Sequence, residues 1–188
     1  MTQSRRQFLT YLAAPLALAA CNSPGLGNGV GSNGAQKIDA RVDATRDYLY
    51  TRYPGTRDLA ASAKGILFIP LVTEVGFGIG GSYGRGALRI NDVTVDYYSA
   101  ASASFGLQIG AQQYAHALFF LTDDALANFR RGNGWVAGAG IHYATPDEGG
   151  SIGKDTTELD PVIAFVFGQQ GLIAGATVSG SKYSRIIP

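Results

Sequence analysis

Hydrophobic positions between residues 36 and 52 recur at helical spacing. Ile38, Val42, Thr45 and Leu49 fall on one face of a helix. Residues of alternating charge occupy the opposite face: Lys37, Asp39, Arg41, Asp43, Arg46 and Asp47. This pattern predicts a helix that packs one stripe on a core and leaves a mixed-charge face to solvent.

A turn is predicted after this helix, and a strand-rich region follows it. Pro54-Gly55 predicts the turn, and Thr56 is expected to cap a short helix that runs to Ala63. From Gly65 the chain consists of short apolar runs, the first of which is expected to end at Pro70. Strands are predicted at residues 66–69, 75–83, 87–90, 93–98, 103–109 and 114–121, with Asn91-Asp92 as one two-residue turn.

The last third of the chain predicts one more helix and several strands. Thr122 is expected to cap a helix that runs to about Arg130 and stops at Gly132-Asn133-Gly134. The predicted remainder is a strand over 135–144, a polar loop over 145–160, and a hairpin of 162–167 with 172–180. With 26 glycines, many within strands, the chain predicts an α+β fold. In it, N-terminal helices pack on a mostly antiparallel, strongly curved Gly-rich sheet or partial barrel.

The N-terminal segment has the pattern of an export signal. Arg5-Arg6 precedes Phe8-Leu9, as in a twin-arginine signal, and an apolar run extends from Phe8 to Ala20. That run is shorter than the ~20 residues of a membrane span, and it contains Pro15. We therefore expect residues 1–20 to be a cleaved twin-arginine signal peptide.

Leu18-Ala19-Ala20-Cys21 resembles a lipobox, in which the cysteine becomes lipid-modified after cleavage. Cys21 is the single cysteine of the chain, so a disulfide within the domain is not expected. Residues 21–34 predict a flexible Gly/Asn/Ser-rich tether, and residues 35–188 one folded domain. Because Asn22 and not Asp follows the cysteine, we expect an envelope lipoprotein anchored in the outer membrane and facing the periplasm.

Charge and composition argue against several function classes. The chain has 15 Lys and Arg against 14 Asp and Glu, a net charge of +1. A nucleic-acid partner is therefore not expected, since such proteins present a strongly basic face. No cofactor and no metal site are expected, because the two histidines, His116 and His142, are far apart and no EF-hand spacing occurs around Asp155, Glu158 and Asp160.

Two glycine-rich stretches match catalytic or nucleotide-binding motifs by letter. Gly76 to Gly81 fits G-x-G-x-x-G, and Gly80-Gly81-Ser82-Tyr83-Gly84 fits G-x-S-x-G. Both motifs require a strand, a turn and then a helix. The sequence predicts strands on both sides, so we expect no catalytic residue and no enzymatic activity.

Four segments together resemble the SYLF domain, a family of lipid-binding domains. They are Ala63 to Pro70, Gly76 to Gly86, Ser104 to Gln112, and Gly171 to Gly180. The form Ser-Phe-Gly-Leu-Gln-Ile-Gly is similar to the bacterial branch, whose members are often lipoproteins. Eukaryotic relatives bind phosphoinositides and some bind actin, partners that are not expected in a bacterial envelope. An amphipathic helix that inserts into membranes precedes the domain in some relatives, whereas this chain has a tether and a mixed-charge helix there.

The resemblance implies that the domain binds membrane phospholipid through its anionic head group. The basic residues nearest the matching segments are Lys64, Arg85 and Arg89, with Lys182 in the last segment. We expect these four side chains to contact phosphate beside a glycine-floored groove, since arginine binds phosphate with two parallel hydrogen bonds. The alternative is a non-enzymatic scaffold or protein-interaction module of the envelope, with these residues as ordinary surface charge.

Overall fold

The computed structural model describes residues 33–132, 134–138, 141–144, 160–171 and 178–188. Within these ranges the chain forms three helices and one sheet of six strands. In chain order the elements are α1 (Gly34–Arg52), α2 (Thr56–Ser62), β1 (Gly65–Ile90), β2 (Val93–Phe120), α3 (Asp123–Arg131), β3 (Trp135–Val136), β4 (Ile141–Ala144), β5 (Val162–Gly171) and β6 (Lys182–Ile186).

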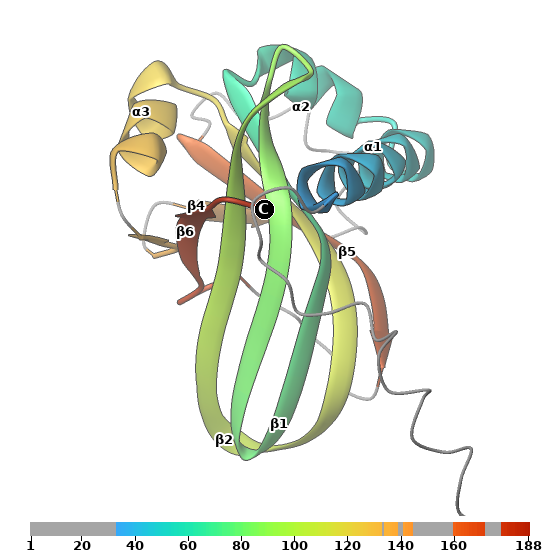
Figure 1. Ribbon diagram of the computed structural model, residues 1–188, viewed down its shortest axis with the longest axis vertical. Coiled ribbons are helices and arrows are strands. Elements are labelled where there is room, and N and C mark those ends of the chain that lie inside the picture. The colour runs from blue at the N-terminus through green and yellow to red at the C-terminus, as the bar shows by residue number, and fades with distance from the viewer. Residues whose placement is uncertain (1–32, 133, 139–140, 145–159, 172–177) are drawn as a thin grey trace, which may run out of the picture.

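The sheet is mostly antiparallel and strongly curved, which confirms the predicted α+β class. Its strand order is β3-β6-β2-β5-β4, and β1 pairs with β2. Among the strands of the described ranges, only the short β4 pairs in parallel, with β5. The helices α1 and α2 lie together on one side of the sheet, and α3 lies on the other (Figure 1).

The long hairpin of β1 and β2 folds back on itself. Both strands run from the helical end of the molecule to the opposite end, bend there and return (Figure 1). A Cβ at Gly84 would lie 2.7 Å from the carbonyl oxygen of Leu71, and a Cβ at Gly86 would overlap the carbonyl oxygen of Phe68. These glycines therefore allow the two halves of β1 to approach closely, and the fold-back centres on Phe77.

Alternate residues of the strands pack into two hydrophobic clusters, one on each face of the sheet. The cluster on the α3 side includes Leu67, Ile69, Leu118, Phe120 and Phe129. The cluster on the α1 side includes Ile38, Val42, Leu49, Leu59, Phe68, Ala117, Phe119, Ile163 and Phe165. The predicted stripe of α1 is thus confirmed as the surface that binds the helix to the sheet.

The predicted breaks within the first two strands are wrong. Pro70 does not end a strand, because β1 continues to Ile90 through an irregularity between Ile69 and Val72. Proline lacks an N–H, and strands accommodate it at such bulges. The predicted turn at Asn91-Asp92 is confirmed, and both residues have positive φ, 50° and 62°, as a type I′ hairpin turn requires.

The predicted helix starts are confirmed in one case and corrected in the other. The Thr122 side chain accepts a hydrogen bond from the backbone N–H of Ala125, which caps α3. Thr56 does not cap α2, whose N-cap position is Gly55. The Thr56 hydroxyl instead donates to the carbonyl of Tyr53 over 2.7 Å, in the turn that joins the first two helices.

The C-terminal strands also differ from the prediction. The expected strand over 135–144 is divided between β3 and β4, and β5 pairs with β2 and β4. Most of the predicted partner segment, residues 172–177, and the predicted loop over 145–159 lie outside the described residues. The strand β6 was not predicted, and it pairs with β2 from Tyr97 to Ala101.

Candidate functional site

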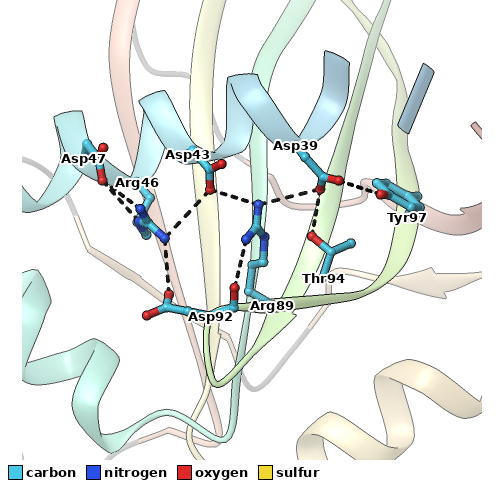
Figure 2. Close-up of polar contacts among 8 residues, drawn as sticks. All are labelled: Asp39, Asp43, Arg46, Asp47, Arg89, Asp92, Thr94 and Tyr97. Atoms are coloured by element: carbon cyan, nitrogen blue, oxygen red, sulfur yellow. Dashed lines mark hydrogen bonds and ion pairs between the residues drawn. The ribbon is translucent and has the colours of Figure 1, made fainter. Parts of the chain in front are cut away.

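An ion-pair network fixes the position of α1 over the turn between β1 and β2 (Figure 2). The Arg89 guanidinium lies 2.9 Å from a carboxylate oxygen of Asp43 and 3.6 Å from one of Asp39. It also donates to the backbone carbonyl of Asp92 over 2.9 Å. The Arg89 side chain is only 11% exposed, so it is committed to contacts within the protein.

Further hydrogen bonds extend this network to β2. Asp39 accepts from the hydroxyls of Thr94 and Tyr97, each over 2.7 Å. Burial, with this hydrogen bond and the Asp39 charge, raises the pKa of Tyr97 to about 12. Arg46 contacts Asp92 at 3.4 Å. One side of α1 is thereby attached to the hairpin, and its orientation over the sheet is set.

The other side of α1 carries Lys37 and Arg41, one helical turn apart, and both face a groove against β1. Arg85 of β1 enters the same groove, which has a volume of about 280 Å³. Within the described part of the chain these three side chains form no ion pair. The groove is lined by Gly34, Lys37, Ile38, Arg41, Pro70, Leu71, Thr73, Tyr83, Gly84 and Arg85.

The floor of the groove is the place where the two halves of β1 meet. Gly84 lies directly against the backbone of Leu71, so a side chain there would separate the halves. Tyr83 and Leu71 are exposed beside the floor and add apolar surface to the basic lining. The groove therefore combines three cations with aromatic and aliphatic side chains. We call it the basic groove.

Only one of the four basic residues predicted from the sequence lies in the basic groove. Arg85 does, whereas Arg89 is occupied by the carboxylates of α1. Lys64 is exposed just before β1, where its backbone N–H donates to Phe120. The side chain of Lys182 lies over Gly134, next to the β3–β6 pair. The four residues therefore do not line one common groove in the described part of the chain.

Sequence reasoning missed Lys37 and Arg41. Their spacing of four residues placed both on one side of the predicted helix. They were assigned to a solvated face because acidic residues alternate with them. In the folded chain the acidic residues bind Arg89 and Arg46, which leaves Lys37 and Arg41 available to a ligand.

The two letter matches to catalytic motifs both lie inside β1. Ser82 is buried in the middle of the strand, and its hydroxyl is 2.7 Å from that of Ser102 on β2. No helix follows either match, so the turn that would present a nucleophile or a pyrophosphate is missing. Among the described residues no group of three or more His, Cys, Asp or Glu is placed to hold a metal ion.

His116 is a buried histidine outside the basic groove. Its Nε2 is 2.9 Å from the hydroxyl of Tyr183, and burial lowers its pKa from 6.5 to about 3. The imidazole is therefore neutral throughout the physiological pH range. It links β2 to β6 within the cluster on the α3 side.

The predicted export and anchoring residues Arg5, Arg6 and Cys21 lie outside the described residues. In the part that the structure describes, no helix has the length and apolar character to cross a bilayer.

Comparison with known proteins gives one family match. Residues 101–185 match the family model of Ysc84, described as Las17-binding protein actin regulator. The matched segment runs from the middle of β2 into β6, and Lys37, Arg41 and Arg85 lie outside it. A comparison with curated proteins gives no match. The family match supports a SYLF domain in this chain, over residues 101–185.

Proposed function

We propose that this domain binds the anionic head groups of membrane phospholipids in the basic groove. The observation that carries the proposal is the convergence of Lys37, Arg41 and Arg85 from two elements into one groove, with no acidic residue among the described residues that line it. Arg46, by contrast, pairs with its acidic neighbours Asp47 and Asp92.

The chemistry of the three side chains suits a phosphodiester. Two guanidinium groups can each donate two parallel hydrogen bonds to phosphate oxygens, and the lysine adds a point charge. Leu71 and Tyr83 border the same groove and can contact the glycerol backbone or the start of the acyl chains. A free inorganic anion would make no use of this apolar border.

Export and lipid anchoring are part of the same proposal. Arg5-Arg6 and the lipobox ending at Cys21 support a twin-arginine precursor that becomes an envelope lipoprotein. Two or more acyl chains on Cys21 would give stable attachment. The residues between Cys21 and Gly34 would then act as a tether that lets the basic groove reach the surface of the anchoring membrane, which we propose is the outer membrane.

The test is flotation of the full chain carrying Cys21→Ser with protein-free vesicles of phosphatidylcholine, with or without phosphatidylglycerol. We expect binding only to the anionic vesicles. A cation near an anionic membrane contributes about 1 kcal/mol, so replacing Lys37, Arg41 and Arg85 with Gln is expected to weaken binding about 100-fold.

The matched control replaces Lys64, Arg131 and Lys182 with Gln. All three are exposed and lie outside the basic groove, and the control removes the same number of positive charges. We expect this control to bind at least tenfold more tightly than the groove variant. Equal losses in the two variants would show a diffuse charge effect and would contradict a head-group site at the groove.

A second candidate function is a protein-interaction module of the envelope. The observation in its favour is the description of the matched family, which names a protein partner, Las17. Vesicles without protein separate the two candidates. If neither vesicle type floats the chain, the protein-interaction function is preferred.

A further inference from the structure

The far half of the β1–β2 hairpin has its apolar residues on the outside. From Leu71 onward, odd-numbered residues of β1 lie on the outer face, which α1 covers only near the helical end. Their exposed fractions are 42% for Leu71, 54% for Val75, 77% for Phe77, 70% for Ile79 and 54% for Tyr83. We call these five side chains the apolar stripe.

The inner face of the same strands carries polar pairs. Gln112 donates to Glu74 over 2.8 Å, and Ser82 contacts Ser102 over 2.7 Å. Both pairs are directly opposed in the strand register. A sheet in water normally places apolar residues inward and polar residues outward. The hairpin has the opposite arrangement at these positions, next to the buried inward pair of Val72 and Tyr114.

The apolar stripe is well placed to meet a flat surface. The fold-back of β1 centres on Phe77, and the bend lies at the end of the molecule opposite the helices (Figure 1). Residues 75–84 and 97–122 contain no Asp, Glu, Lys or Arg. Glu74 is the one charged residue between Leu71 and Tyr83, and its carboxylate lies on the inner face, where it accepts from Gln112. The outer face of the bend can therefore enter an apolar medium without carrying a formal charge into it.

The apolar stripe is also continuous with the basic groove. Leu71 and Tyr83 belong to both, and Lys37, Arg41 and Arg85 lie at the border nearest α1. An anionic bilayer has the complementary order, with phosphate at the surface and acyl chains beneath it. A tyrosine at the boundary suits the interface between these two layers.

We propose that the bent end of the hairpin penetrates an anionic phospholipid bilayer, with Phe77 and Ile79 among the acyl chains and the basic groove at the level of the phosphates. This inference rests on the proposed head-group site for its orientation, and it adds a second, apolar mode of attachment. The basic groove would select the membrane surface, and the apolar stripe would hold the domain in it.

The test uses an environment-sensitive fluorophore on a single cysteine. In the full chain with Cys21→Ser, the label is attached at Phe77→Cys or, in a second variant, at Ile79→Cys. The controls carry it at Val136→Cys or Ile187→Cys, two exposed positions outside the hairpin. With vesicles containing phosphatidylglycerol, we expect a blue shift and quenching by acyl-chain-brominated lipid at residues 77 and 79 only.

A second measurement uses no label. Replacing Phe77 and Ile79 with Ser removes most of the apolar surface at the bend and is expected to weaken vesicle binding at least about tenfold. Circular dichroism should remain that of the unsubstituted chain, because both side chains are exposed.

Three outcomes would overturn the inference, and they differ in their effect on the proposed function. Vesicle binding without a change at residues 77 and 79 would leave the head-group site intact and exclude penetration. A blue shift that grows with protein concentration without lipid would show that a second copy covers the apolar stripe. Failure of the full chain to bind any vesicle would contradict both proposals.

Discussion

The carbonyl oxygen of Phe68 occupies the space that a β-carbon at position 86 would need, so only glycine fits where the two halves of β1 cross. Gly86→Ala is expected to destabilise the domain by about 3 kcal/mol or prevent folding, because backbone atoms must move to relieve the overlap. Thermal denaturation followed by circular dichroism measures the effect.

Gly138→Ala is the control for this substitution. Apart from its chain neighbours, no described residue has an atom closer than 4.0 Å to a Cβ at this position, so the melting temperature should change little. Similar losses in both variants would mean that the close approach within β1 is not the reason for glycine at position 86.

Arg85 and Arg89 are four residues apart on β1, yet we expect opposite consequences when each is changed to Gln. Arg89→Gln leaves Asp39 without its cation and Asp43 with only the more distant Arg46, 3.8 Å away. It should lower the free energy of unfolding by about 2 kcal/mol, since hydrogen bonds to charged groups contribute ~1.5–3 kcal/mol and the carboxylates are partly exposed. Arg85→Gln should leave stability unchanged and weaken vesicle binding. Urea denaturation and vesicle flotation of both variants measure these effects. An Arg89→Gln variant with an unchanged free energy of unfolding would contradict the role of Arg89 in stabilising the fold.

The buried His116 makes stability depend on pH. Below pH 6.5 the unfolded chain binds a proton at this imidazole, whereas the folded chain, with a pKa of about 3, does not. The contribution of His116 is therefore fully present above pH 6.5 and is lost as pH falls toward 3. Between pH 7 and pH 5 the loss is about 2 kcal/mol. Urea denaturation of the unsubstituted chain and of His116→Gln at pH 7 and pH 5 measures this loss. If the free energy of unfolding falls by the same amount between the two pH values in both proteins, His116 is not its cause.

Cys21→Ser tests the acyl anchor independently of the domain. In cells that export the protein, this substitution should move it from the membrane fraction to the soluble periplasmic fraction or leave it as a weakly bound, salt-extractable species. Extraction that still requires detergent would show that another attachment dominates.

Local patterns in the sequence were sufficient for the helices and for the class of fold. The buried face of α1, the Thr122 cap and the Asn91-Asp92 turn each depend on residues close in sequence. The continuity of β1 through Pro70 depends instead on pairing with β2, in which Ile69 faces His116 and Val72 faces Tyr114. Whether the strand continues through Pro70 therefore depends on a partner strand more than forty residues away. The spacing of apolar residues within β1 carries no information about that partner.

The candidate site was only partly predictable for the same reason. Arg85 was identified from its neighbours in the chain, but Lys37 and Arg41 reach it only because α1 docks across β1. That docking relies on Arg89 pairing with Asp43, 46 residues away in sequence. Because Arg89 forms this ion pair, its role is to stabilise the fold. Its position in the sequence, beside a segment that resembles the SYLF domain, did not indicate that role.

The proposed function depends on joint contact of Arg41 and Arg85 with phospholipid head groups. The most direct measurement is side-chain nitrogen NMR of the chain carrying Cys21→Ser, titrated with short-chain phosphatidylglycerol and, separately, phosphatidylcholine. We expect the Nε–H signals of Arg41 and Arg85 to shift with one common midpoint in phosphatidylglycerol, while that of the exposed Arg131 does not shift. Equal shifts of all three signals, or no shift at Arg41 and Arg85, would rule out joint contact at the basic groove.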